Sequence, residues 1–212
     1  MKEKEIHFPS GELSLEGVLH IPEGDAPFPA VIVCHPHPLY GGSMENNVVN
    51  SLCAALVKSG ILALKFNFRG VGRSQGEFGE GIGEQEDVRA ALSFVVGVKE
   101  VDAGRIGLAG YSAGAKFSFS VGVADDRIKA LAAVSPPLSM YDFIPPEDCV
   151  KPKFLISGSL DNIAPSREFQ KFCQGLPQPR ECVTADGVDH FWWGKESILA
   201  DRVAGFFAKA LK

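Results

Sequence analysis

The sequence predicts an α/β protein whose sheet is mostly parallel and doubly wound, with helices on both faces. Three observations support this fold class. A β-branched run at residues 30–34 (AVIVC) predicts a strand that is buried on both faces. After it, strand-like and helix-like segments alternate with short connections, which is typical of parallel sheets. Before it, two alternating segments predict an antiparallel hairpin at one edge of the sheet.

The strands follow from alternation and from short apolar runs. The hairpin comprises residues 3–8 and Leu13–Ile21, joined by a turn that contains Pro9 and Gly11. In its second strand every other residue from Leu13 to Leu19 is apolar or glycine, so we expect one buried face. Six further strands are predicted at residues 30–34, 61–68, 105–109, Ile128–Val134, 153–157 and Arg180–Ala185.

Five helices are predicted where apolar residues recur at three- and four-residue spacing. Gly60 follows the first helix, at a position that favours glycine because the backbone there has positive φ. Pro165 suits the first turn of the fourth helix, where no N–H donor is needed. The helices span Asn47–Lys58 and residues 84–98, 113–123, 165–174 and 196–211.

The segment between residues 134 and 153 bears on domain organisation. It has room for one small helix and none for an inserted domain, so we predict no cap domain. The whole chain, residues 1–212, is expected to form a single domain, which is an ordinary length for an α/β fold.

Composition excludes several classes of protein. The chain is 45% hydrophobic and 22% charged, which is average for globular proteins and excludes a disordered or fibrous chain. The net charge of −5 argues against a nucleic-acid partner. The N-terminus has no long apolar core of a signal peptide, and no run of 18 apolar residues predicts a membrane span. We therefore expect a cytoplasmic protein without membrane partners.

The five cysteines show neither a disulfide framework nor a zinc-binding pattern. Their number is odd and no two form a CxxC pair, and most of them lie in apolar runs. This pattern predicts reduced thiols, as in a cytosolic protein. The cysteines are Cys34, Cys53, Cys149, Cys173 and Cys182.

The first candidate for chemistry is the pentapeptide GYSAG at residues 110–114. It fits G-x-S-x-G and lies between a predicted strand and a predicted helix. Glycines allow a tight turn there, which would expose the hydroxyl of Ser112 as a nucleophile and direct the following N–H groups to the same place. The alternative is that Ser112 only caps the N-terminus of the helix.

A nucleophilic serine needs a base and a carboxylate that orients the base. Asp161 and His190 follow two later strands, so both are expected at the carboxyl edge of the sheet together with Ser112. The chain order Ser, Asp, His is that of one class of hydrolase. Asp161 could instead stabilise its own turn. The rival carboxylates are Asp142, Asp186 and Asp189.

Taken together, the motifs resemble the α/β-hydrolase superfamily over nearly the whole chain. They are HPHPLYGG at 35–42, FNFRGVGRSQG at 66–76, GYSAG at 110–114, GSLDNIAP at 158–165 and GVDHFW at 187–192. The chain is most similar to small lidless bacterial hydrolases, of the dienelactone hydrolase-like and prolyl oligopeptidase-like kinds. The resemblance implies an α/β-hydrolase fold, with Ser112 as nucleophile, His190 as base and Asp161 as acid. Dienelactone hydrolase itself has a cysteine nucleophile.

The oxyanion of the reaction needs two N–H donors. The first is expected from Ala113, directly after the nucleophile. The second should come from the loop HPHPLYGG, where Pro36 and Pro38 have no N–H, which leaves His37 or a residue from Leu39 onward. The resemblance, to families with an HG-x motif in this loop, implies the backbone of His37. The side chain of His35 is then expected to brace the loop.

Two further features have competing interpretations. The glycine-rich loop at residues 69–83 could hold a phosphate, but its spacing is G-x-G-x-x-x-G, and a structural loop braced by Arg69 is favoured. Aromatic and soft side chains gather in the predicted loops, and Trp192 could either wall a pocket or cover the end of the sheet. The predicted pocket residues are Leu39, Tyr40, Met140, Phe143 and Trp192, taken from a wider set that includes Met44, Phe78, Tyr141 and Trp193.

These observations predict a carboxylesterase that cleaves small-molecule esters with short to medium acyl groups through an acyl-serine intermediate. No metal or organic cofactor is implied. The alternatives are a small peptidase or thioesterase of the same fold, or a non-catalytic or nucleotide-binding α/β module. The oligomeric state is not determined, and a homodimer is left open.

Overall fold

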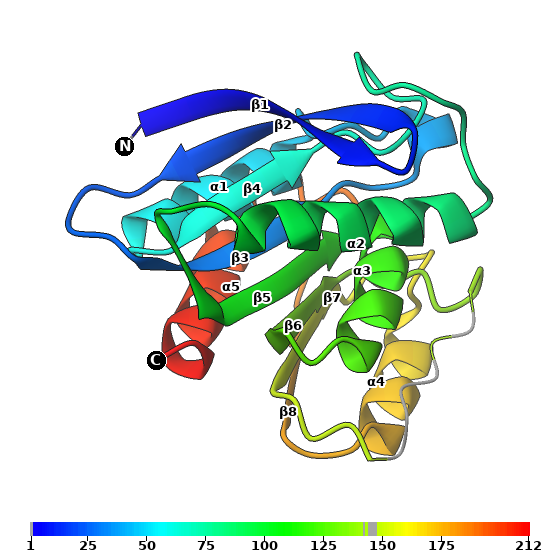
Figure 1. The fold of residues 1–212 in the computed structure, drawn as a ribbon. Coiled ribbons are helices and arrows are strands. Elements are labelled where there is room, and N and C mark those ends of the chain that lie inside the picture. Colours follow the sequence, from blue (N-terminus) through cyan, green and yellow to red (C-terminus); the bar gives the residue numbers. More distant parts are fainter. Residues whose placement is uncertain (1, 142, 144–147) are drawn as a thin grey trace.

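The computed structural model describes residues 2–141, 143 and 148–212. Its centre is an eight-stranded sheet in the order β1-β2-β4-β3-β5-β6-β7-β8 (Figure 1). β3 to β8 are parallel, whereas β2 pairs antiparallel with both β1 and β4. The strands are β1 (Lys2–Ser10), β2 (Leu13–Ile21), β3 (Phe28–Cys34), β4 (Leu62–Phe66), β5 (Val101–Tyr111), β6 (Ile128–Val134), β7 (Lys153–Gly158) and β8 (Arg180–Ala185).

Helices cover both faces of this sheet, as the doubly wound pattern predicts (Figure 1). α1 and α5 pack on one face, and α2, α3 and α4 pack on the other. The helices are α1 (Asn47–Lys58), α2 (Ile82–Val96), α3 (Ala113–Ala124), α4 (Ser166–Gly175) and α5 (Glu196–Ala210), with a 3₁₀ turn at Pro38–Tyr40.

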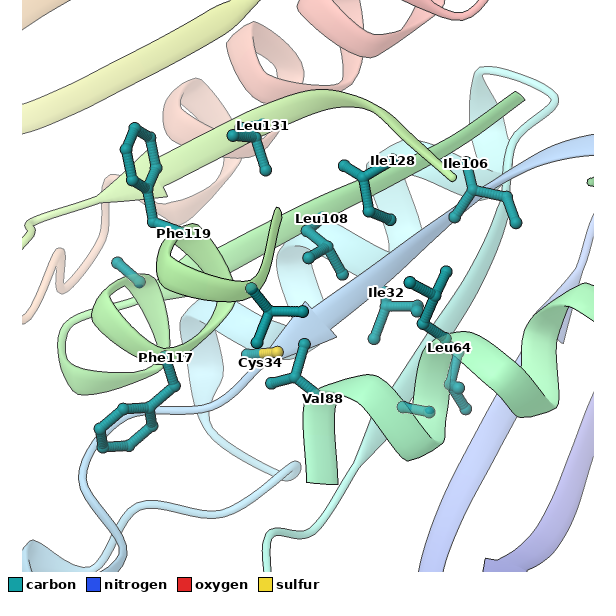
Figure 2. Packing of buried hydrophobic residues seen from close by; sticks show 14 of the residues in the cluster. Ile32, Cys34, Leu64, Val88, Ile106, Leu108, Phe117, Phe119, Ile128 and Leu131 are labelled. Atoms are coloured by element: carbon teal, nitrogen blue, oxygen red, sulfur yellow. The ribbon is translucent and has the colours of Figure 1, made fainter. Parts of the chain in front are cut away.

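The strand β3 shows how the sheet divides the core in two. Ala30, Ile32 and Cys34 lie in the cluster under α2 and α3, and Val31 and Val33 lie in the cluster under α1 and α5. Both sets are fully buried, so an uninterrupted β-branched run suits this position. Figure 2 shows the first cluster, in which side chains from β3, β4, β5 and β6 meet Val88 of α2 and the phenylalanines of α3.

The predicted fold class is confirmed, and the differences at element ends have local causes. β4 ends at Phe66, two residues early, because the next N–H groups, of Asn67 and Phe68, bond to the Glu16 carbonyl and the His35 ring. α2 begins two residues early, at Ile82. The carboxylate of Glu84 accepts hydrogen bonds from the N–H groups of Gly79 and Gly81, so it caps the helix from within the first turn.

The expectation of five reduced cysteines is wrong for two of them. Cys173 and Cys182 form a disulfide between α4 and β8, with their Cα atoms 6.3 Å apart. The two cysteines are nine residues apart in sequence, and the chain reversal after α4 brings them together. Spacing rules do not detect such a pair, because its proximity depends on how the helix packs against the strand. Cys34, Cys53 and Cys149 are free and buried.

The loop after β4 is a structural loop, as favoured from its sequence. The guanidinium of Arg69 bonds to the buried carboxylate of Asp87 through Nε and Nη2, and Nη2 also contacts Glu86. The backbone N–H of Arg69 donates to Asp87 as well. This loop is therefore pinned to the first turns of α2.

The connection from β6 to β7 contains only turns and irregular backbone in its described residues, 135–141, 143 and 148–152. It adds no cap over the carboxyl edge of the sheet in that described part. Asp142, one of the rival carboxylates, lies outside the described residues. None of the helices in the described part of the chain has the length and apolarity that crossing a bilayer requires.

Candidate active site

Ser112 lies in a tight turn between β5 and α3. Its φ of 53° and ψ of −124° form a strained conformation for a residue with a side chain. The flanking glycines are required by close packing, since a Cβ at Gly110 would overlap the backbone of Gly114. A Cβ at Gly114 would overlap the carbonyl oxygens of Cys34 and His35. The Ser112 side chain makes no capping bond to α3, so the helix-cap alternative is wrong.

The side chains of Ser112, His190 and Asp161 form a continuous hydrogen-bonded chain. The Oγ of Ser112 lies 3.0 Å from Nε2 of His190. The Nδ1 of His190 lies 3.0 Å and 2.9 Å from the two carboxylate oxygens of Asp161. All three residues are buried, although they come from three different strand ends. The order and placement expected from the sequence are therefore present as direct contacts.

Asp161 is surrounded by donors that favour its ionised form. Burial on its own raises the pKa of this carboxyl, but hydrogen bonds and charge from His190, followed by bonds from Ala164 and Ser135, outweigh burial and lower it. The N–H groups of Ile163 and Ala164 donate to Oδ1 at 2.9 Å and 2.8 Å. Asp161 therefore stabilises its own turn and also bonds to His190, so the two roles considered from the sequence are compatible.

The rival carboxylates near His190 have other partners. Oδ1 of Asp189 accepts the N–H groups of Phe191 and Trp192, at 2.9 Å and 3.2 Å, and so shapes the loop that carries the histidine. Asp186 accepts a hydrogen bond from Ser159. Neither carboxylate takes the place of Asp161 beside the imidazole.

The loop HPHPLYGG forms the opposite wall of the site and is braced by His35. Its Nδ1 bonds to the Pro36 carbonyl at 2.6 Å, and its Nε2 accepts the N–H of Phe68 at 3.1 Å. Complete burial lowers the pKa of His35 to about 4, so the ring is neutral, as an acceptor at Nε2 requires. This is the structural brace that the sequence predicted. Gly42 closes the loop, since a Cβ there would overlap the Pro36 carbonyl.

His37 and Ala113 face the same cavity as Ser112. Ala113 is the first residue of α3, where backbone N–H groups have no partner inside the helix. The N–H of His37 makes no backbone hydrogen bond among the described residues. Its ring accepts the N–H of Leu39 and packs against Tyr40 and Phe78, with ring centroids 4.6 Å and 4.9 Å away. The imidazole of His37 thus stabilises the loop, and the residue lines the cavity.

A cavity of about 370 Å³ opens directly over Ser112 and His190. Its walls come from the HPHPLYGG loop, the turn after β6, the end of β5 and the loops that carry Asp161 and His190. The lining is mainly apolar and aromatic, with an open rim formed by Tyr40, Met140 and Phe191, which are 78%, 51% and 54% exposed. Such a site is suited to an uncharged organic group held beside the serine.

Comparison with known proteins identifies the family of the chain. The sequence model of the family described as X-Pro dipeptidyl-peptidase (S15 family) matches residues 11–193, which include Ser112, Asp161 and His190. The chain belongs to the S15 family. It is a hydrolase of α/β fold, within the superfamily that its motifs resemble.

Relatives of this S15-family chain include proteins without a described activity. An uncharacterised protein of Rickettsia prowazekii is 34% identical over 77% of the chain and 72% of its own length. An uncharacterised 31.7 kDa protein of Escherichia coli is 29% identical over 53% of the chain. The chain spans only 39% of that protein and 63% of an uncharacterised protein of Mycobacterium tuberculosis, so some relatives carry substantial additional sequence.

Solved structures resemble the S15-family chain over nearly its full length. A Coxiella burnetii structure described as an α/β serine hydrolase homologue is 34% identical, covers 96% of both chains and has a TM-score of 0.86. A Xanthomonas campestris structure described as an α/β serine hydrolase without a lid is 31% identical, with a TM-score of 0.86, and covers 99% of this chain and 95% of its own. The protein is therefore a member of the lidless α/β serine hydrolases.

The predicted pocket residues divide into two groups in this S15-family hydrolase. Tyr40 and Met140 line the cavity over Ser112. Leu39 does not line this cavity, and it lines a separate surface groove instead. Phe143 is buried between Phe119 and Phe172.

Trp192 also lies outside the cavity, so its interpretation as a pocket wall is wrong. Its indole is buried in the core under α1 and α5, and Nε1 donates to the hydroxyl of Ser135 at 3.0 Å. Trp192 adopts a φ of 61°, in the left-handed region. Trp192 thus covers the end of the sheet, which was its alternative interpretation, and Trp193 is 72% exposed.

Several lining residues were not singled out from the sequence. Tyr111, Ile163 and Phe191 line the cavity and are each within two residues of a member of the hydrogen-bonded chain. Their adjacency to Ser112, Asp161 and His190 could have identified them. Asn46 and Pro137 also line it, but only the packing of separate loops brings them there.

Proposed function

We propose that this S15-family protein hydrolyses carboxylic esters through an acyl-serine intermediate. The observation that carries the proposal is the continuous chain from Ser112 through His190 to Asp161, with contacts of 2.9–3.0 Å, at the floor of an apolar cavity. A serine in this arrangement can lose its proton to the histidine as it attacks a carbonyl carbon.

The reaction has two half-reactions. The Ser112 oxygen bonds to the acyl carbon while Nε2 of His190 takes the hydroxyl proton. Collapse of the tetrahedral intermediate breaks the bond to the alkoxy group, which leaves as an alcohol with that proton. Water then attacks the acyl-serine, again giving a proton to His190, and the acid leaves as Ser112 recovers its proton. Asp161 remains ionised throughout and stabilises the imidazolium through Nδ1.

The oxyanion formed in each half-reaction needs donors that face the acyl carbon. We assign this role to the backbone N–H groups of Ala113 and His37, because both residues line the cavity together with Ser112. Two such donors, fixed in place before the reaction, stabilise the developing charge far more than they stabilise the neutral substrate. This arrangement supports acyl transfer as the reaction class.

The lining favours an uncharged acyl group of short to medium length. Tyr40, Met140 and Phe191 present apolar surface around the mouth of the cavity, and its volume of about 370 Å³ fits a small ligand. The family match supports a second candidate, cleavage after an X-Pro dipeptide by the same serine chemistry. The two candidates differ in the leaving group and in the need to hold a free N-terminus.

One set of measurements tests both candidates. A fluorophosphonate probe should label the wild-type protein at Ser112 and should not label Ser112→Ala. Ser112→Ala should fold and lose activity by roughly 10⁶-fold, as serine knockouts in such triads do. p-Nitrophenyl acetate and butyrate are then compared with glycyl-prolyl-p-nitroanilide. A larger kcat/KM on the esters supports the esterase, a larger value on the anilide supports the peptidase, and absence of Ser112 labelling contradicts both.

A further inference from the structure

Tyr111 is placed to hold His190 from a direction that the triad does not use. It is the last residue of β5, directly before Ser112, and its ring is buried at the edge of the cavity. Its hydroxyl donates a hydrogen bond of 2.8 Å to the backbone carbonyl of His190. The two rings lie with their centroids 5.6 Å apart and tilted by 33°. Tyr111 therefore contacts the backbone of His190, and the next residue, Ser112, contacts its side chain.

The loop around His190 needs such an anchor. A Cβ at Gly158 would overlap the Val188 carbonyl, so the loop passes within backbone contact of β7 on one side. On the other side, Trp192 adopts a positive φ, and its indole is fixed by Ser135. Between these points the His190 carbonyl is held by Tyr111 alone among the described hydrogen bonds.

We infer that the Tyr111 hydroxyl is a positioning group that sets the distance between Nε2 of His190 and Oγ of Ser112. The inference rests on the proposed function, because it concerns how the base is held against the nucleophile. The hydroxyl is available for this role throughout the reaction, since burial raises its pKa and keeps it protonated at neutral pH. Tyr111 is not expected to exchange a proton with substrate, and its bond is to a backbone atom that does not react.

The consequence is a loss of rate without a comparable loss of binding. Without the hydroxyl, the His190 backbone can shift while Asp161 still holds Nδ1, so Nε2 spends less time within reach of Oγ. Displacement of a catalytic group by about 1 Å can cost up to about a hundredfold in rate. The cavity walls keep their shape in a phenylalanine variant, so KM should change little.

The test compares Tyr111→Phe with Ser118→Ala. Ser118 also loses a buried hydroxyl bonded to a backbone carbonyl, that of Ala115 at 3.3 Å, but it does not line the cavity. We expect kcat to fall about ten- to a hundredfold in Tyr111→Phe with KM within about twofold, and the rate of Ser112 labelling by the fluorophosphonate to fall in parallel. Ser118→Ala should keep wild-type rates. Replacement of Tyr111 by p-aminophenylalanine, which retains a donor, should restore kcat.

The outcomes separate this inference from the proposed function. If wild type neither reacts with the probe nor cleaves esters or the anilide, the proposed function fails. If wild type is active and Tyr111→Phe has an equal kcat, or shows only a raised KM, the positioning role is wrong. If Tyr111→Phe does not fold, the p-aminophenylalanine variant decides: a kcat near wild type supports the inference, and a tenfold loss contradicts it.

Discussion

Single residues at this site combine backbone strain with specific hydrogen bonds. Ser112, which contacts His190, and Trp192, two residues after His190, both hold positive φ, at 53° and 61°. Such conformations cost free energy and persist only where the surroundings enforce them. Here Gly110 and Gly114 allow the tight turn at Ser112. The burial of the Trp192 indole fixes the backbone conformation of Trp192. The strain therefore lies where the reacting side chains must be aimed.

His37 provides a test of backbone against side-chain function. Its φ of −54° is close to the value of about −65° that proline imposes, and its ψ of 122° already precedes a proline. His37→Pro removes the N–H and should lower kcat about 10²- to 10³-fold with a smaller change in KM. His37→Ala keeps the N–H and should retain most of kcat.

Steady-state kinetics on p-nitrophenyl butyrate measures both variants, after their thermal midpoints show that they are folded. Similar, severe losses of kcat in the two folded variants would assign the role to the imidazole. A folded proline variant with normal kcat would move the donor to Leu39 or a later residue.

His35 should make stability depend on pH. Burial lowers its folded-state pKa to about 4 from an ordinary value of 6.5, so the unfolded chain binds a proton more readily. Its contribution to stability is complete above pH 6.5 and is lost as pH falls toward 4. Between pH 7 and pH 5 the free energy of unfolding should fall by about 2 kcal/mol from this group. Burial lowers the pKa of His20 too, which adds to the same trend.

Urea unfolding at pH 7 and pH 5 measures this effect. His35→Gln should reduce the difference between the two pH values, whereas the control His7→Gln, at an exposed position of β1, should leave it as in wild type. An unchanged pH dependence in His35→Gln would show that the imidazole is not held neutral.

At the scale of elements, the site is assembled by close approach of backbones. β3 ends beneath the turn that carries Ser112, and β7 ends beneath the loop that carries His190. At Gly114 and at Gly158 the neighbouring chain is so close that a Cβ would overlap a carbonyl oxygen. These glycines determine how tightly the elements around the site can pack.

Two glycine substitutions test how packing at these glycines affects stability, and they should change the free energy of unfolding in opposite directions. Gly114→Ala should lower the free energy of unfolding by about 3 kcal/mol, because its Cβ has to displace backbone. Gly205→Ala, inside α5 with nothing within 4 Å of the new Cβ, should raise it by about 0.5–1 kcal/mol. Denaturant titration of both variants gives the two values, and equal effects would mean that the close approach does not constrain the turn.

The disulfide between α4 and β8 gives a second prediction at the scale of elements. Cys173 and Cys182 close a short loop, for which loop-closure entropy gives a stabilisation of about 2–3 kcal/mol. The thermal midpoint should fall when a reductant is added, and the variant with both cysteines replaced by alanine should not respond to it. A midpoint that is the same with and without reductant in wild type would contradict the pairing.

At the scale of the whole molecule, the fold leaves the carboxyl edge of its sheet uncapped in the described residues. The rim side chains Tyr40, Met140 and Phe191 face solvent although they are apolar. The solved Xanthomonas campestris relative is likewise described as having no lid. Among the described residues, no segment has to move to open the cavity.

An open site predicts a preference for small soluble substrates. p-Nitrophenyl acetate and butyrate should have larger kcat/KM values than the dodecanoate, because no segment among the described residues extends the walls around a long chain. The rate on tributyrin should not rise abruptly at the concentration where it forms droplets, since no lid has to open. Rates that increase with chain length and with aggregation would show that the apolar rim itself binds long chains.

The sequence by itself determined the fold class, the hairpin, all eight strands and five helices, and the three residues of the hydrogen-bonded chain. These follow from local patterns, because strand ends of a parallel sheet share one edge and motifs at those ends must lie together. Asp161 and His190 were located by their strands rather than by any contact between them.

Only the tertiary structure decided which residues line the cavity, that Trp192 is buried in the core, and that Cys173 and Cys182 form a disulfide. Trp192 and Phe191 are neighbours in sequence, yet Trp192 is buried under α5 with its indole bonded to Ser135, and Phe191 borders the cavity. Cys173 and Cys182 meet through the packing of α4 on β8. Such outcomes depend on contacts between distant segments, which no spacing rule along a single chain contains.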